Sequence, residues 1–186
     1  MGAGKSTALK ALQELGAQVL STDAVVHELY SDPRVKDAVV ERWGPEVAPG
    51  GVVDRAAVAA RAFAGGNEDR RWLESLLWPL VGTRIAAWLE SVRALRPRPR
   101  AAVVEVPLLF EAGMESGFDA TIAVIAEEGT RRARAAGRGH ALAEERAMRQ
   151  LSQEEKAERA SFVIRNDGSE GDLRRELADV LAKLSV

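Results

Sequence analysis

The chain opens with MGAGKST, residues 1–7, and this stretch decides the expected fold. It matches the second half of the phosphate-binding pattern G-x-x-x-x-G-K-[ST], with Gly4, Lys5 and Ser6 in the last three positions. In such a loop, backbone amides and a helix N-terminus hold phosphates, while the lysine and the hydroxyl serve the outer phosphates and magnesium. We therefore predict a nucleotide site here; a flexible start to a helix is the alternative. The residues predicted to line the site are Gly2, Ala3, Gly4, Lys5, Ser6 and Thr7.

Length and composition are those of an ordinary globular domain. The chain has 186 residues, of which 46% are hydrophobic and 29% charged. The net charge of −2 does not point to nucleic acid or an anionic membrane, and the absence of cysteine excludes disulfides and thiolate chemistry. The sequence shows no signal pattern and no apolar run of the ~20 residues that span a bilayer. We expect a soluble, cytoplasmic monomer that acts on a small molecule.

Downstream of the loop, apolar runs alternate with helical patterns, which favours an α/β fold with a mostly parallel sheet. Strands are predicted at residues 17–20, 101–106, 121–126 and 162–164. Helices are predicted at 6–15, 23–30, 33–43, 54–63, 67–78, 80–92 and 170–184, and a further helix is opened by the capping box of Ser152 and Glu155. Pro79 is expected to interrupt or kink the helical stretch around it. RPRPR, residues 96–100, is interpreted as a connector, with a phosphate contact as the alternative.

Two acids follow predicted strands. Asp23 lies just beyond the first strand, where the carboxyl ends of parallel strands meet ligands, so it could accept a proton or hold a metal's water shell. A helix N-cap is the other role considered for Asp23. Glu105 follows four apolar residues, as in a Walker-B strand whose acid positions magnesium. Pro107 should then take the chain out of the sheet, so that LLFE, residues 108–111, lines the crevice; the alternative is that its apolar residues fill the core.

A cluster of arginines follows the third predicted strand. It comprises Arg131, Arg132, Arg134 and Arg138, close to two glycines. Arginines on a closing lid can neutralise the charge on a transferred phosphoryl group, whereas a solvated helix face is the alternative. We predict a lid at 129–150, with Arg134 as the phosphate contact and Arg138 as the other choice.

These features, in this order and over nearly the whole chain, resemble the dephospho-coenzyme A kinase family of P-loop kinases. The matching stretches include GAGKST (2–7), VLSTDAVVHEL (19–29), EVPLLFEAG (105–113) and ASFVIRNDG (160–168). The resemblance implies one domain, 1–186, with a three-layer P-loop NTPase fold, a parallel sheet, a helical acceptor-binding region at 31–95 and an Arg-rich lid. It also implies magnesium-assisted transfer of the γ-phosphoryl of ATP to the ribose 3′-hydroxyl of dephospho-coenzyme A, giving coenzyme A and ADP.

The resemblance further implies roles for single residues. Asp23 is the base, Asn166 lies beside the adenine, and Ser6 with Glu105 positions the metal. The expected acceptor contacts are Asp23, His27, Trp78, Pro107, Leu108 and Glu111. Three residues depart from the family pattern: Ser21 replaces an acid, Trp78 a histidine and Ser161 an aspartate. Trp78 could instead stack on a base.

The family also has a strand and a Gly-rich turn before the position of Met1. Losing that central strand would expose its neighbours, and an unpaired buried backbone group costs about 1–3 kcal/mol. We therefore expect a protein that starts at Met1 to fold poorly or to bind ATP weakly. Our hypothesis is a natural start further upstream, which the intact mass of the native protein would test.

Two other functions stay open. One is another small P-loop kinase that acts on a nucleotide or a metabolite, and EVPLLFEAG counts against it. The other is a degenerate, non-catalytic nucleotide-binding domain, which the missing first glycine of the loop would suggest. Lys5, Ser6 and Asp23 are present, however, and this favours an enzyme.

Overall fold

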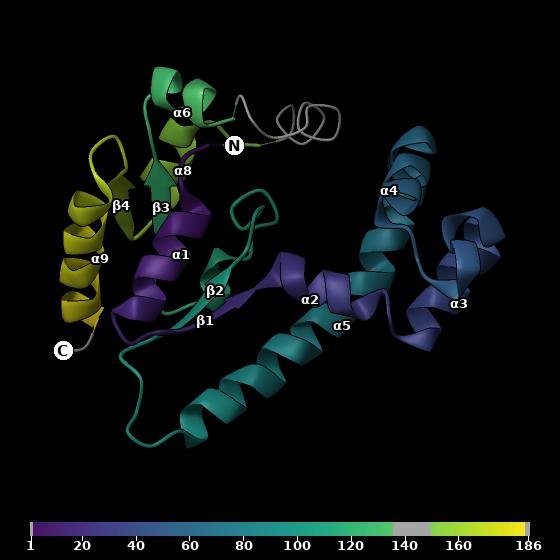
Figure 1. Ribbon diagram of the computed structural model, residues 1–186, viewed down its shortest axis with the longest axis horizontal. Coiled ribbons are helices and arrows are strands. Elements are labelled where there is room, and N and C mark those ends of the chain that lie inside the picture. Colours follow the sequence, from purple (N-terminus) through teal and green to yellow (C-terminus); the bar gives the residue numbers. More distant parts are fainter. Residues whose placement is uncertain (1, 136–149, 185–186) are drawn as a thin grey trace. The chain divides into compact units, whose positions relative to one another are not determined.

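The computed structural model describes residues 2–135 and 150–184, and two units can be distinguished in it (Figure 1). The first unit consists of the chain up to Val19 together with the chain from Arg96 onward, and the second is Leu20–Leu95. The predicted boundaries of the helical region and the lid remain predictions. Residues 136–149 of that lid, including Arg138, lie outside the described residues.

Short strands and two longer helices build the first unit. Its principal elements are α1 (Lys5–Glu14), β2 (Ala102–Glu105), β3 (Ile122–Ile125), β4 (Phe162–Arg165) and α9 (Glu170–Leu184). β3 and β4 run parallel, with Ile122 opposite Phe162, as the α/β prediction requires. β1 (Gln18–Ser21) pairs with β2, and the Gln18 amide donates to the Ala101 carbonyl at 2.9 Å. The described strands therefore form two two-stranded sheets rather than one continuous sheet.

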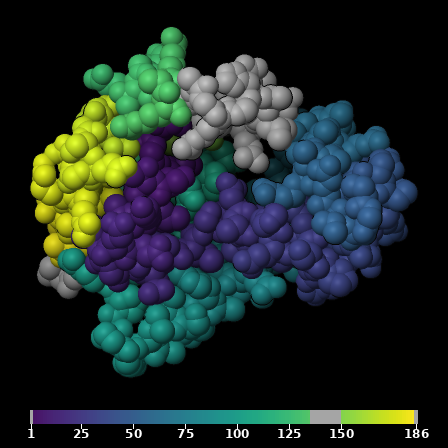
Figure 2. Space-filling model, in the orientation of Figure 1, coloured from purple at the N-terminus to yellow at the C-terminus, as the bar shows by residue number. Residues whose placement is uncertain are grey.

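Both sheets contribute to one apolar core. α1 and α9 lie side by side (Figures 1 and 2). The two helices supply most of the buried side chains of this core. On α9, Leu173, Leu177 and Leu181 recur every four residues and so share one helix face. Each buried leucine contributes about 1.5–3 kcal/mol relative to exposure. Val103 of β2 and Val124 of β3 pack against the same core.

The described part of the first unit contains two further, shorter helices. They are α6 (Glu128–Ala135) and α8 (Gln153–Arg159), and a 3₁₀ turn lies at Glu115–Gly117. The predicted capping box opens α8: the Glu155 amide donates to Ser152 Oγ, and the Ser152 amide donates to Glu155 Oε2 at 2.8 Å. Gln153 then holds α8 against the end of β3, because its amide group both donates to and accepts from the Ala126 backbone.

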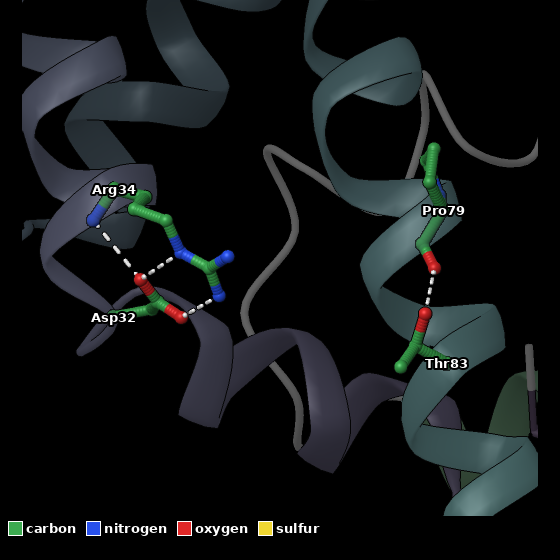
Figure 3. A network of polar contacts seen from close by, with 4 residues as sticks. All are labelled: Asp32, Arg34, Pro79 and Thr83. Carbon is green, nitrogen blue, oxygen red and sulfur yellow. Dashed lines mark hydrogen bonds and ion pairs between the residues drawn. The ribbon is translucent and has the colours of Figure 1, made fainter.

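The second unit is helical beyond β1. It contains α2 (Thr22–Leu29), α3 (Pro33–Trp43), α4 (Arg55–Ala64) and α5 (Gly66–Ala94), with 3₁₀ turns at Pro45–Val47 and Pro49–Gly51. Aspartates cap two of these helices. The Arg34 backbone amide donates to Asp32 (Figure 3), and the Ala56 backbone amide donates to Asp54. Among the described residues, no helix combines the length and hydropathy that crossing a membrane requires.

α5 is one helix, so the predicted interruption at Pro79 is wrong, whereas the predicted kink stays a prediction. Proline lacks an amide hydrogen, so one helical hydrogen bond is lost at this point. The next turn keeps its geometry, and Thr83 Oγ1 donates to the Pro79 carbonyl at 2.9 Å (Figure 3). Leu77, before the proline, and Leu80, after it, pack into the same apolar cluster. Tertiary packing thus outweighs the local preference for a break.

Candidate functional site

The predicted phosphate loop ends in an open helix N-terminus. Gly4 is the N-cap of α1, in the left-handed conformation with φ 89°, and no side chain caps the helix. The first turn carries no acid, and both Lys5 and Ser6 are exposed. The first amides of a helix have no intrahelical acceptor and carry the positive end of the helix dipole. This end of α1 therefore has the chemistry of an anion site.

Two glycines allow other parts of the chain to approach the loop closely: backbone at Gly2 and a side chain at Gly4. A Cβ on Gly2 would lie 2.5 Å from the Arg131 carbonyl oxygen, and a Cβ on Gly4 would lie 2.0 Å from Asn166 Nδ2. Both glycines also have a positive φ, which other residues adopt at a cost. Glycine is thus required at Gly2 and Gly4 by conformation and by space, and the loop packs against α6 and the end of β4.

Asn166 and Arg134 lie against this loop. Asn166 is buried, and its Nδ2 donates to the Ala3 carbonyl at 2.9 Å. Arg134 Nη1 donates to the Asn166 backbone carbonyl at 2.8 Å and lies 3.9 Å from the position of a Cβ on Gly4. The structure therefore brings the predicted loop, the predicted adenine-side residue and one predicted lid arginine together. Arg132 instead pairs with Glu128 on the same helix.

The stretch after β2 divides into exposed and buried side chains. Glu105 is the last residue of β2 and is half-buried, and the chain leaves the strand before Pro107. Leu108 is exposed, whereas Phe110 is buried. Phe110 therefore fills the core, as the alternative interpretation predicts, whereas Leu108 is exposed enough to contact a ligand.

Glu111, predicted to contact the acceptor, makes two contacts within the first unit. Its Oε1 accepts from the Leu151 amide at 3.0 Å and lies 2.8 Å from Lys156 Nζ. The two side chains are only 13% and 20% exposed, and Glu111 Oε2 is buried with no hydrogen-bond partner among the described residues. Lys156 was missed by the sequence reasoning, because nothing local to α8 indicates a partner so distant in the chain.

A second acid–base contact follows nearby. Arg159 pairs with Glu115 and places its guanidinium 5.5 Å from the centre of the Phe110 ring. The hydrogen bond from Arg159 is the main reason that the pKa of Glu115 lies below its usual value. Together with the Glu111 contacts, this pair fastens the loop after β2 to α8.

Asp23 lies in the first turn of α2, in the second unit, and is exposed. The N-cap of α2 is Ser21, so the alternative role of Asp23 as an N-cap is wrong. The strand extends one residue further than predicted, to Ser21, and α2 begins directly at Thr22. Asp23 therefore lies one residue inside the helix.

His27 follows Asp23 by four residues, so the two side chains share one face of α2. His27 Nδ1 lies 3.2 Å from Arg55 Nη1, at the start of α4. Because a guanidinium only donates, His27 Nδ1 can serve only as the acceptor in this contact. Burial raises the pKa of the nearby Tyr30 hydroxyl, and the charge of Arg55 opposes that rise.

Trp78 lies on α5 and is 55% exposed. Two other tryptophans of this unit, Trp43 and Trp72, pack against its buried apolar residues. Their rings meet edge to face with centroids 5.0 Å apart, and the Arg42 guanidinium lies over the Trp72 ring. Trp78 thus keeps the exposure that stacking on a ligand would require. The predicted acceptor contacts divide between the units, with Asp23, His27 and Trp78 in the second and residues 107–111 in the first.

The chain is similar to known proteins over nearly its whole length. The profile of the family described as Dephospho-CoA kinase matches residues 1–172. A Deinococcus radiodurans protein named dephospho-CoA kinase is 38% identical over 189 residues, covering 100% of this chain and 89% of that protein. One from Chlorobaculum tepidum is 37% identical over 192 residues, covering 99% and 91%.

The fold comparison gives the same result. A crystal structure of a Thermus thermophilus protein superposes with a TM-score of 0.79 at 34% sequence identity, covering 100% of this chain and 94% of that one. The match extends over both units described above. On the sequence profile, the relatives and the fold together, this chain belongs to the dephospho-CoA kinase family.

Proposed function

We propose that this enzyme transfers the γ-phosphoryl group of ATP to the ribose 3′-hydroxyl of dephospho-coenzyme A, giving coenzyme A and ADP. Family membership supports this pair of substrates. The structural observation that carries the proposal is the uncapped N-terminus of α1, with Arg134 held beside Gly4. A helix end without a side-chain cap, next to a guanidinium, suits a polyphosphate.

On the nucleotide side, the amides of residues 2–7 hold the phosphates and Lys5 neutralises the outer two. Arg134 stabilises the charge on the transferred group; its hydrogen bond to Asn166 supports this choice among the arginines, since it anchors the side chain beside the loop. Thr7 serves the α-phosphate. Asn166 closes the adenine side of the site.

Magnesium fits the oxygen donors of the first unit. Ser6 offers a hydroxyl at the start of α1, and Glu105 offers a carboxylate at the end of β2. In the described part of the chain, no group of three or more His, Asp or Glu side chains is placed to enclose a metal. Magnesium in phosphoryl-transfer sites needs few protein ligands, because waters and substrate phosphates complete its shell. When bound, it would neutralise phosphate charge.

On the acceptor side, Asp23 orients the 3′-hydroxyl and takes its proton. The hydroxyl oxygen then bonds to the γ-phosphorus while the bond to the bridging oxygen of ADP breaks, in line. His27, Trp78, Pro107, Leu108 and Glu111 are the proposed acceptor contacts. Exclusion of water by the arginine-rich segment would limit hydrolysis of ATP.

We also infer that the protein acts in the cytoplasm as a monomer, and neither nucleic acid nor a membrane enters the proposed reaction. The net charge of −2 gives no sign of a nucleic-acid or membrane partner, and the lack of cysteine is compatible with a reducing cytoplasm. Size-exclusion chromatography with light scattering tests the monomer, and a mass near twice 20.1 kDa would contradict it.

The deciding experiment measures ADP release from magnesium ATP with and without dephospho-coenzyme A, and identifies the product by mass spectrometry. We expect ADP release to require the acceptor and coenzyme A to form. Lys5→Ala should lower turnover by about 10²–10³-fold, the usual effect of removing one group that stabilises developing charge. ADP release that other small acceptors stimulate better would indicate a different kinase. Nucleotide binding without turnover would indicate a non-catalytic domain.

A further inference from the structure

The side chain of Asn166 is directed at the phosphate loop. Its Nδ2 donates to the Ala3 carbonyl at 2.9 Å, and only 5% of the residue is exposed. A Cβ on Gly4 would lie 2.0 Å from the same nitrogen. The side-chain amide of Asn166 therefore hydrogen-bonds to the backbone of the loop, next to Gly4.

We propose that Asn166 is a positioning residue for the phosphate loop, acting through the Ala3–Gly4 peptide unit. In a planar trans peptide, the carbonyl and the amide hydrogen point in opposite directions. Holding the Ala3 carbonyl toward Asn166 therefore holds the Gly4 amide hydrogen pointing away from Asn166. The inference rests on the proposed phosphate-binding role of the loop, and it assigns Asn166 a task that does not depend on the base of the nucleotide.

Asn166 is itself held firmly enough for this task. Its backbone amide donates to the Ile125 carbonyl at 2.8 Å, which continues the parallel pairing of β3 with β4. Its carbonyl accepts from Arg134 Nη1 at 2.8 Å. The next residue, Asp167, accepts from the Glu127 amide. The anchor therefore belongs to the end of the sheet, and not to the loop that it orients.

The loop needs such an anchor, because its glycines do not restrict their own conformations. Gly2 and Gly4 have φ values of 81° and 89°. Glycine populates positive and negative φ with similar ease, so a peptide unit next to glycine can rotate at little cost. A single hydrogen bond to the Ala3 carbonyl selects one of these orientations before the nucleotide arrives.

The test compares three variants. Asn166→Ala removes the donor without a change of charge. The double variant Asn166→Asp with Asp167→Asn has the wild-type charge but turns a carboxylate oxygen toward the Ala3 carbonyl. Asp167→Asn alone is the matched control, since its Oδ1 can still accept from the Glu127 amide. The assays give KM for ATP, KM for dephospho-coenzyme A, and the inhibition constant of inorganic tripolyphosphate, which has no base.

We expect both Asn166 variants to raise KM for ATP about tenfold, the effect of one lost hydrogen bond. The inhibition constant of tripolyphosphate should rise by the same factor. KM for dephospho-coenzyme A should not change, and the Asp167 control should match the wild type. A variant that is only less stable would lose turnover, but its KM for ATP would not rise relative to its KM for dephospho-coenzyme A.

Three outcomes would overturn the inference. Weaker ATP binding with unchanged tripolyphosphate inhibition would mean that Asn166 acts only through the base and does not position the loop. Unchanged constants for both ligands in the double variant would show that the hydrogen bond has no role, and this variant is close enough to asparagine in shape to fold. Failure of tripolyphosphate to inhibit a wild-type enzyme that still converts dephospho-coenzyme A to coenzyme A would overturn the phosphate role assigned to the loop, and with it this inference, while leaving the proposed function in place.

Discussion

The two units use different means to present their predicted functional groups. In the first, backbone atoms dominate: Gly2 and Gly4 let the loop approach Arg131 and Asn166, and the helix N-terminus supplies amides. In the second, side chains dominate, since Asp23, His27 and Trp78 project from helices and are exposed. A phosphate can be held by a short stretch of backbone, and the pattern is then visible in consecutive residues. An acceptor held by side chains of several helices leaves no such pattern.

The sharpest test of this difference is Asp23→Asn. If the second unit supplies the base, turnover should fall by about 10²–10⁴-fold, because a general base contributes that much. KM for ATP should stay near the wild-type value, since the nucleotide groups lie in the first unit. Asp37→Asn, on the exposed side of α3, is the matched control. Turnover close to wild type in the Asp23 variant would remove this residue from the base role.

Replacing one glycine by alanine in each unit distinguishes the cost of a positive φ from the effect of a contact made by the added Cβ. Gly4 and Gly50 both have a positive φ, at 89° and 65°, but nothing lies within 4 Å of a Cβ on Gly50. Alanine at either site should lower the free energy of unfolding by about 1–2 kcal/mol, the cost of a left-handed conformation. Only Gly4→Ala should also raise KM for ATP, about tenfold or more, because its Cβ displaces Asn166. Thermal unfolding and initial rates measure both effects.

An equal effect of Gly4→Ala and Gly50→Ala on KM for ATP would show that the contact with Asn166 has no importance. An unchanged KM in Gly4→Ala would lead to the same conclusion, provided that thermal unfolding shows the expected loss of stability. Either result would remove the distinction drawn between a functional and a structural glycine.

Two ion pairs of equal length allow a comparison of burial. Lys156 Nζ–Glu111 Oε1 and Arg61 Nη2–Glu46 Oε1 are both 2.8 Å long, but the first pair is 20% and 13% exposed and the second 52% and 54%. Double-mutant cycles by chemical denaturation, with Lys156→Met and Glu111→Gln, should give a coupling energy of about 0.5–3 kcal/mol. Arg61→Met and Glu46→Gln should give about 0.2–1 kcal/mol. A coupling energy no larger for the buried pair would contradict the role assigned to Glu111 and Lys156 in fastening the loop after β2.

The smallest effect concerns Asp32, at the N-cap of α3. Side-chain and backbone hydrogen bonds from Arg34 lower its pKa from 3.8 to about 2 (Figure 3). Since the folded pKa lies below the unfolded one, Asp32 stabilises the fold above pH 3.8, and this contribution is lost as the pH falls toward 2. A carboxyl titration by NMR should have its midpoint near 2, and Asp32→Asn should remove this part of the pH dependence of stability. A midpoint near 3.8 would show that the Arg34 contacts do not persist in solution.

Much of the local structure could be predicted because it depends on neighbouring residues. α3 runs Pro33–Trp43 and α9 runs Glu170–Leu184, both as predicted, because caps and one apolar face mark such helices. The capping box at Ser152 and the connector at 96–100 were confirmed for the same reason. Prediction went wrong at the Asp23 cap, because the strand extended one residue further than its apolar run.

By itself, the sequence determined the loop pattern, the order of the principal strands and helices, and the family. A phosphate loop needs glycine at positive φ and a lysine after it, and both requirements concern consecutive residues. Only the tertiary structure decided that α5 continues through Pro79, that Glu111 meets Lys156, and that Asn166 holds the Ala3 carbonyl. The last two are contacts between segments far apart in the chain. Their existence depends on how the core packs, which no local pattern of residues specifies.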